Sequence, residues 1–593
     1  MEGEMAHGCA APPATAGPFS VRVGGRVLLF LLLLVLLGSR PLSAATNLGT
    51  EEQRLRQRRD QRGRQQRTEV PDTRQLPETV APPAAELPVE SPCFTIDRLR
   101  LTIPADLLRR HPDTAVLLRP GGRLFFLQEE LRRYRGRCLG TAGINLIIRR
   151  LTALLIDRGF TTTRIAIPEQ DLSSGVLRLE LIPGLIRNLL PAGDIHGFSR
   201  NALPFKPGDL LNLRDLEQGL EQMLRVAGQD VRFDLLPGDL PGESDIRITI
   251  HRSRPLRLLL SLDNSGSNDT GRWLAGATLQ FDTPLRLNDS LEIGYQDSAR
   301  RSSDGKSADD LRLDWSIPWG WWRLECEASR YHYRQRVNGS NQSFTSSGES
   351  ERFGATLTRT LWRGQRQKGE LLLGVRRRRS HSFIDDSEIL VQRRNLTEAE
   401  AALQQRLYLG KAQLDLKLAH HWGSRWFGAD RDLPGRQPGD PSFFYRLQTL
   451  DLNLAAPLSA ASTPIRCNLT LHAQYADRQL FGSEQLAIGS RYTVRGFDGD
   501  RMLSGERGFY LRDNLDIPLG KSGQDLYFGL DYGRVGGPSS RFQPGRELVG
   551  GLVGLRGNWK GFGYDLFAGW PLHQPDGFDS GGTTVAVNLV WGM

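Results

Sequence analysis

Two short stretches in the last third of the chain are its most informative features. Residues 485–497 read QLAIGSRYTVRGF, and residues 529–533 read GLDYG. The first stretch ends with Arg495, Gly496 and Phe497, an arginine followed at once by a glycine that favours a tight turn. The second places Asp531 between two glycines in a segment that alternates like a β-strand. Arg-Gly-Phe alone is a common surface tripeptide, so its meaning depends on the chain around it.

The surrounding chain has the pattern of a membrane barrel. From Pro255 to Met593 helical periodicity nearly vanishes, and short alternating runs are separated by Gly, Asn, Asp and Ser turns. In the last run, every second residue from Val585 to Met593 falls on one face. A strand with a lipid-facing side and a lumen-facing side needs this period of two. We therefore expect residues 255–593 to form a transmembrane antiparallel β-barrel.

The N-terminus predicts export. Arg22 and Arg26 precede an apolar run from Val27 to Leu37, and a small-residue stretch follows. This is the layout of a secretory signal peptide, so we assign residues 1–44 to it and expect cleavage near Ala44. The net charge is +10 at pH 7. Because export removes the protein from nucleic acid, we assign this charge to loops and the lumen wall and expect no nucleic-acid partner.

Residues 45–92 predict a polar helix and a tether. The stretch from Glu51 to Arg67 is rich in Arg and Gln and has almost no apolar face, so it cannot bury itself in a core. We assign a helix to residues 45–70 and an extended, proline-rich linker to residues 71–92. Plain disorder of this region remains the alternative.

Two small α/β domains follow. Residues 93–186 predict the order strand, helix, helix, strand, strand, and residues 187–252 repeat the scheme with a helix that begins in a capping-box-like way at Asn212 and Asp215. Cys93 and Cys138 bracket much of the first domain, and export permits a disulfide between them. Such a bond would stabilise the domain by about 4 kcal/mol on the chain-entropy model.

This organisation resembles the outer-membrane transporters of two-partner secretion, the haemolysin-activator and filamentous-haemagglutinin-transporter family of the Omp85 superfamily. The stretch from Gly159 to Gly175 resembles the first periplasmic docking domain (POTRA domain) of that family, and Leu213 to Leu220 resembles the second. The resemblance implies a mainly β fold: an N-terminal plug helix, two periplasmic POTRA-like domains and a 16-stranded barrel. Length alone would equally permit 14 or 18 strands.

The resemblance also implies roles for the opening motifs. It places Arg495, Gly496 and Phe497 at the tip of a long loop that folds back into the lumen, where Arg495 meets Asp531 on the inner wall. A charge held in a narrow lumen is costly unless paired, and arginine can bind a carboxylate through two parallel hydrogen bonds. Family members usually end in an aromatic residue that signals barrel assembly. This chain departs from that pattern, because Trp591 stands two residues before a terminal Met593.

The implied function is an outer-membrane pore that recognises an unfolded exoprotein in the periplasm and moves it to the cell surface. Expected partners are a large secreted exoprotein of haemolysin, adhesin or contact-dependent-toxin type, outer-membrane lipid, and the barrel-assembly machinery during biogenesis. The sequence contains no Gly-x-Ser-x-Gly or His-Glu-x-x-His motif, so no catalytic residue, metal or cofactor is expected. Two alternatives remain: an assembly factor for other barrels, which usually has more POTRA domains, and a passive porin or receptor.

Overall fold

The computed structural model describes residues 44–68, 73, 86–195, 198–299, 305–338, 342–432, 434–437, 439–460 and 463–592. The predicted signal peptide, up to residue 43, and Met593 lie outside these ranges, and the predicted linker is described only at Thr73 and residues 86–92. Within the described ranges, no helix combines the length and the apolar character that crossing a membrane requires.

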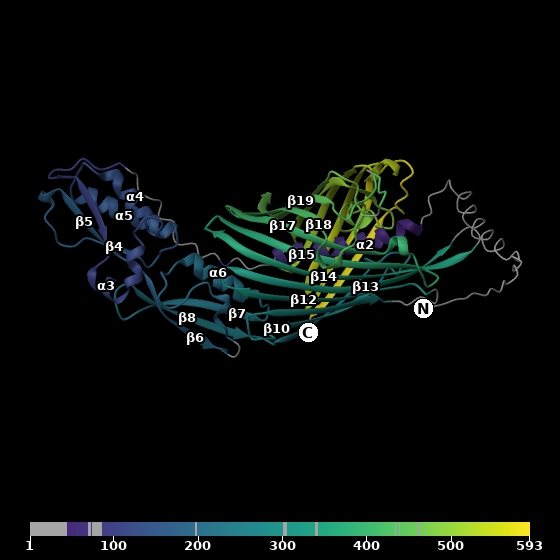
Figure 1. Cartoon of the computed structure of the whole chain (residues 1–593), viewed down its shortest axis with the longest axis horizontal. Coiled ribbons are helices and arrows are strands. Elements are labelled where there is room, and N and C mark those ends of the chain that lie inside the picture. Colours follow the sequence, from purple (N-terminus) through teal and green to yellow (C-terminus); the bar gives the residue numbers. More distant parts are fainter. Residues whose placement is uncertain are drawn as a thin grey trace, which may run out of the picture. The chain divides into compact units, whose positions relative to one another are not determined.

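The C-terminal region is a closed antiparallel barrel, drawn in teal to yellow in Figure 1. Its strands are β9 (Leu256–Asp263), β10 (Leu274–Asp282), β11 (Ser290–Ser298), β12 (Ser307–Trp319), β13 (Trp322–Asn338), β14 (Ser343–Arg363), β15 (Gln367–Ile384), β17 (Arg394–Leu409), β18 (Ala412–Ser424), β19 (Arg446–Ala460), β20 (Thr463–Ala476), β23 (Arg507–Pro518), β24 (Gln524–Gly536), β25 (Glu547–Trp559), β26 (Phe562–His573) and β27 (Thr584–Gly592). A two-residue strand, β16 (Ser387–Glu388), pairs antiparallel with the last residues of β15 and adds no strand to the ring. Strand β27 pairs with β9 and closes the ring, which confirms the 16-stranded barrel.

Alternation along the strands separates lipid from lumen. On β18, Leu414, Leu416 and Leu418 alternate with Asp415 and Lys417. The two charged residues find lumen-side partners, since Asp415 pairs with an arginine of β17 at 2.6 Å. Several strands are far longer than the alternating runs that sequence reveals: β14 has 21 residues, whereas about 9–11 residues cross a bilayer. The strand residues that extend beyond the bilayer contact water on both faces, so they show no apolar alternation.

The first α/β domain contains β1 (Phe94–Ile96), β2 (Arg98–Thr102), α3 (Ala105–Arg110), α4 (Phe126–Leu131), β3 (Arg137–Leu139), α5 (Thr141–Asp157), β4 (Arg164–Ala166) and β5 (Val176–Ile182). Its main sheet has the order β2-β5-β4, and α5 packs Ile147 and Leu151 into its core. A disulfide joins Cys93 to Cys138 on β3, with 5.4 Å between the Cα atoms. Sequence analysis missed α3 and β3, because elements of six and three residues are too short to show a period.

The second α/β domain contains β6 (Leu185–Gly193), α6 (Leu213–Leu224), β7 (Gln229–Pro237) and β8 (Glu243–Arg252), with the sheet order β6-β8-β7. The side chain of Asn212 caps α6 by accepting a hydrogen bond from the backbone N–H of Arg214 at 2.8 Å. The predicted capping box is only half formed, because the Asp215 carboxylate pairs instead with Arg123 of the first domain, at 3.1 Å.

Candidate functional site in the barrel lumen

Residues 482–506, between β20 and β23, form a folded unit that we call the lumen loop. It contains two short paired strands, β21 (Leu486–Ile488) and β22 (Leu503–Gly505). Val494 and Phe497 are fully buried, and they belong to an apolar cluster that includes Leu548 of β25. The loop therefore has a core of its own, shared with the inner wall of the barrel.

The structure brings Arg495 and Asp531 together. Nε and one terminal nitrogen of the guanidinium each donate to a different carboxylate oxygen, both at 2.7 Å. The backbone N–H of Arg495 adds a third bond to the same carboxylate at 2.8 Å. The remaining donors reach the Asn514 side chain at 2.6 Å and the Asp513 carbonyl at 2.8 Å. Arg495 is 2% exposed and Asp531 0%, so this is a buried, bidentate ion pair.

Glycines of the wall allow the loop tip to approach so closely. A Cβ atom at Gly550 of β25 would lie 1.7 Å from the carbonyl oxygen of Arg495. A Cβ at Gly529 would lie 2.8 Å from the Arg495 guanidinium. Gly496 itself has a φ of +105° and lies against the backbone of Trp570. Gly529 belongs to the GLDYG stretch that the sequence singled out, but nothing in the sequence singled out Gly550.

Phe497 completes the tip. Its ring meets that of Phe578 edge-on, with 5.9 Å between the centroids. All four residues of the predicted loop site thus lie in one buried cluster. Trp591 is elsewhere, on β27 beside Leu260, and its side chain is exposed on the outside of the barrel. Its role in assembly stays a prediction.

Helix α2 (Ala44–Thr68) makes the other contacts in the lumen (Figure 1). Toward the lumen loop, Gln57 donates to the Ala487 carbonyl at 3.0 Å and accepts from Ser490 Oγ at 2.6 Å. Arg54 donates to the carbonyl of Gly499 at 3.0 Å. Toward the wall, the contacts reach four strands, with Arg58 on Gln296 of β11, Arg59 on Asp310 of β12, Glu51 on Tyr331 of β13 and Gln61 on Arg512 of β23. A polar helix therefore crosses the lumen.

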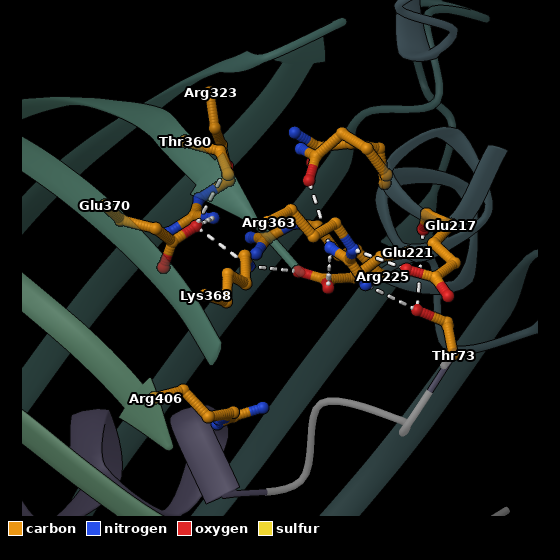
Figure 2. Close-up of polar contacts among 12 residues, drawn as sticks. Thr73, Glu217, Glu221, Arg225, Arg323, Thr360, Arg363, Lys368, Glu370 and Arg406 are labelled. Atoms are coloured by element: carbon orange, nitrogen blue, oxygen red, sulfur yellow. Dashed lines mark hydrogen bonds and ion pairs between the residues drawn. The ribbon is translucent and has the colours of Figure 1, made fainter. Parts of the chain in front are cut away.

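A second set of charges, which sequence analysis missed, joins α6 to the barrel. Figure 2 shows Arg363 and Lys368, at the facing ends of β14 and β15, pointing toward the carboxylates of α6. Arg363 pairs with Glu221 at 2.7 Å and with Glu217 at 3.3 Å. Lys368 reaches Glu221 at 2.5 Å. Thr73, in the segment between α2 and the first domain, accepts a hydrogen bond from Arg363 at 2.8 Å. We call these residues the α6 cluster.

The α6 cluster is electrostatically satisfied although it is buried. Burial by itself would raise the pKa of Glu221, but the cations Lys368 and Arg363 lower it well below its ordinary value of 4.5. Nothing in the sequence marked these residues, because Glu and Gln on one side of an amphipathic helix ordinarily face water. In α6 that side is covered by the barrel: Gln222 donates to the carbonyl of Gly320 in the β12–β13 turn at 3.2 Å.

Comparisons with known proteins agree with this architecture. Residues 242–557 match the haemolysin secretion/activation protein family ShlB/FhaC/HecB, residues 123–184 match the ShlB-type POTRA domain, and residues 187–237 match a further POTRA domain. The outer membrane transporter CdiB-2 of Burkholderia pseudomallei is 37% identical over 553 residues, covering 92% of this chain and 94% of that protein. The hemolysin transporter protein ShlB of Serratia marcescens is 28% identical and covers 67% of this chain and 71% of its own length.

The solved structure of CdiB from Acinetobacter baumannii superposes with a TM-score of 0.78 at 25% identity, covering 92% of this chain and 99% of that one. The fold, the paired docking domains and these relatives define an outer-membrane transporter of the two-partner secretion class, with its POTRA domains in the periplasm. The chain belongs to the haemolysin secretion/activation protein family ShlB/FhaC/HecB. The members of this family are transporters rather than enzymes, and the partner that the class implies is a large secreted exoprotein.

Proposed function

We propose that this transporter captures its unfolded exoprotein by strand addition to the POTRA domains and passes it, extended, through the barrel lumen. Edge strands support this step. In the described part of the chain, β2 and β4 each have one strand neighbour in the first sheet, and β6 and β7 each have one in the second. Such edges present unpaired backbone donors and acceptors to an extended segment.

The first sheet also has a basic outer face. Arg98 and Arg100 on β2 and Arg178 on β5 are exposed, while the alternate residues Leu101 and Leu179 are buried in the core. An extended chain that adds to this sheet would therefore lie beside a row of guanidinium groups. Acidic side chains at alternate positions of the exoprotein segment would be favoured there.

The observation that carries the proposal is the way the lumen is occupied. Helix α2 crosses it, so a polypeptide passes only when α2 moves. Among the described side chains of α2, Leu55 is the only apolar one that is buried, and the helix contacts the loop and wall through hydrogen bonds and ion pairs. Water and a hydrated polypeptide can replace such contacts at little net cost. We assign α2 the role of a plug that leaves during transport.

The Arg495–Asp531 pair has the opposite role in this proposal. It locks the lumen loop to the wall, so that the loop shapes the pathway while the plug departs. The step needs no catalytic centre, metal or cofactor. Outward-facing leucines contact membrane lipid, Trp591 takes part in recognition by the barrel-assembly machinery, and the Cys93–Cys138 bond braces the first docking domain.

Deletion of the gene tests the proposal. Culture medium and cell surface are compared by mass spectrometry between the deletion strain, the parent and a complemented strain. The expected result is loss of one very large protein that the intact gene restores. Broad depletion of outer-membrane barrels would favour an assembly factor instead. Altered solute uptake with unchanged secretion would favour a porin or receptor.

A further inference from the structure

The outer face of β18 and β19 changes character near one end of the barrel. Leu418 of β18 lies opposite Leu450 of β19, and both side chains face lipid. The next outward pair is His420 with Gln448, and the one after it is Trp422 with Arg446. The apolar surface thus gives way, over two rungs of the sheet, to an aromatic and basic one.

This end is the extracellular one. The β17–β18 turn lies beside the turn between β14 and β15, where Tyr408 donates its N–H to the carbonyl of Arg366. The adjoining Arg363 and Lys368 contact α6 of the second periplasmic domain. Because β18 begins at this periplasmic edge with Ala412, it reaches the cell surface at Ser424.

A recess opens at the junction. It has a volume of about 460 Å³, and it is lined by His420, Trp422, Gly423, Phe444, Tyr445 and Arg446. The imidazole of His420 stacks on the indole of Trp422, with 5.6 Å between the ring centroids. Arg425, which is not itself a lining residue, lies against the lining residue Phe444, with its guanidinium 4.8 Å from the centre of the ring. The lining is therefore mainly aromatic, with Arg446 among the lining residues and Arg425 against Phe444.

The two cations lack carboxylate partners. Within the part of the chain that the structure describes, neither Arg425 nor Arg446 forms an ion pair, although arginines elsewhere on the outer face do, such as Arg330 with Glu349 at 2.7 Å. Both side chains are exposed. An aromatic girdle is a general property of membrane barrels and accounts for the tryptophan. It does not account for Arg446 in the lining of the recess and Arg425 beside it, neither of which forms an ion pair with any residue that the structure describes.

The depth of the recess matches one layer of the membrane. Gln448 and Arg446 stand two and four residues beyond Leu450, which is about 7 and 13 Å along a strand. For a strand tilted by about 40°, this places them about 5 and 10 Å above the last leucine. That interval is the headgroup region, which lies just outside a hydrocarbon core about 30 Å thick. In the outer leaflet of a bacterial outer membrane, phosphorylated glycolipids occupy this layer.

We propose that this recess is a binding site for the phosphorylated headgroup of an outer-leaflet glycolipid. Arg425 and Arg446 bind its phosphate groups, because guanidinium and phosphate oxygens form charge-assisted paired hydrogen bonds. Trp422 and Phe444 pack against the sugar rings, and the leucine rungs below receive the acyl chains. The inference rests on the outer-membrane placement of the barrel and not on the exoprotein pathway, so secretion and lipid binding can fail separately.

Binding of bis-phosphorylated lipid A in mixed detergent micelles to the purified full-length protein tests the site. The double variant Arg425→Gln/Arg446→Gln is expected to bind about tenfold more weakly, as the loss of charge-assisted bonds to phosphate predicts. Dephosphorylated lipid A should bind the wild type with a similar loss, and millimolar inorganic phosphate should not displace the lipid. The matched control is Arg359→Gln. This arginine also stacks on an outward tryptophan, Trp322, at 4.9 Å, but at the periplasmic end and outside the recess, so its loss should leave binding unchanged.

Equal binding by the double variant, or by dephosphorylated lipid A, would overturn the proposal. Displacement by inorganic phosphate would show a plain anion site and overturn it as well. A second measurement does not depend on how the variant folds: photoreactive lipid A is cross-linked to the wild-type protein, and the labelled peptides are mapped. Labelling is expected within residues 418–450, and labelling concentrated elsewhere on the barrel would contradict the site. Secretion by the double variant is measured in parallel and is expected to be normal.

Discussion

The lumen loop and helix α2 both lie in the barrel lumen, but different kinds of interaction hold them there. The loop shares an apolar core with the wall and adds a buried, bidentate pair between Arg495 and Asp531. Among the described side chains of helix α2, one apolar side chain, Leu55, is buried, and the others touch the loop and wall through polar groups. The first arrangement is costly to break, since it exposes a core and separates buried charges. The second can be exchanged for water at little cost.

In the proposed mechanism, this difference separates a loop that stays in place from a helix that leaves. Burial alone does not make the distinction, because Arg54 of α2 and Arg495 of the loop are both buried. What differs is how firmly the wall carboxylate that departure leaves behind was held: Arg59 of α2 reaches Asp310 of β12 at 3.3 Å, whereas the loop tip makes three bonds to Asp531. When α2 leaves, its cations leave with it and regain water. If the loop tip leaves, Asp531 remains uncompensated in the wall.

The largest effect is expected at Asp531. Asp531→Ala leaves Arg495 buried without its carboxylate, and breaking such a pair costs about 3–5 kcal/mol. Secretion, measured as exoprotein in the medium per folded barrel, should fall by more than about tenfold. The matched control is Asp525→Ala on the same strand, whose partner Arg466 is half exposed. Normal secretion by Asp531→Ala at normal barrel levels would show that the loop is not a lock.

An effect of comparable size, but reversible, is expected when α2 is tied to the loop. Cysteines at Gln57 and Ser490, whose side chains touch at 2.6 Å, are joined by a reducible thiol cross-linker, with the free Cys326 and Cys467 replaced by serine. Secretion should stop on cross-linking and return on reduction. Each single cysteine, treated with linker and reductant, shows whether the reagents alone have an effect. Continued secretion through the cross-linked protein would mean that α2 need not leave.

An intermediate effect on secretion is expected at the α6 cluster. This third group of buried charges holds the second α/β domain, rather than a loop, against the barrel. Glu221→Gln leaves Lys368 near Glu370, at 2.9 Å, so some compensation remains. Secretion should fall a few-fold, and amide hydrogen exchange in the β14–β15 turn should accelerate. Asp234→Asn, in an exposed pair with Arg232 on β7, is the control and should change neither.

We expect the contribution of Glu221 to the stability of the α6 cluster to be independent of pH near neutrality. The pKa of Glu221 is lowered in the folded protein, so its stabilising contribution is fully present above its ordinary value of 4.5 and is lost only as pH falls well below that. Amide hydrogen exchange in the β14–β15 turn, corrected for the pH dependence of intrinsic exchange rates, should therefore show no change from ionisation of Glu221 between pH 5 and 8. A loosening that sets in near neutral pH would contradict this account of the α6 cluster.

The smallest effect on secretion is expected within α2. Arg54→Ala removes the bonds to Gly499 and Asp500 in the loop. The plug should then leave more often, and single-channel recordings in planar bilayers should show more open time. Secretion should remain close to normal. A fall in secretion as large as that for Asp531→Ala would erase the distinction between plug and lock.

Sequence predicted the repeated features better than the isolated ones. The period of two from Thr584 to Trp591 is forced by lipid on one side and lumen on the other, so it can be read without a structure. The contact between Arg495 and Asp531 was expected only because both motifs resemble those of a known family, since spacing along the chain does not reveal a contact across a lumen. Gly550 carries no such motif, although the backbone of the loop tip depends on it.

The polar contacts of the α6 cluster and the lining of the recess could also not be predicted from the sequence, and the reason is a different one. The acidic face of α6 reads as a solvated surface, and only the three-dimensional fold brings Arg363 to it (Figure 2). The recess between β18 and β19 depends equally on register, because it is the pairing of Trp422 with Arg446 that sets the aromatic wall beside the cation. Neither relation is local in sequence.

Distances between spin labels in outer-membrane vesicles test the central claim most directly. One pair joins Asp60 of α2 to Asp386 at the rim of the barrel, and the other joins Arg501 of the lumen loop to the same rim position; all three side chains are exposed. Double electron–electron resonance is recorded with and without the exoprotein. The account predicts that the Asp60 distance lengthens and broadens while the Arg501 distance stays unchanged. A loop distance that shifts while that of α2 stays fixed would contradict it.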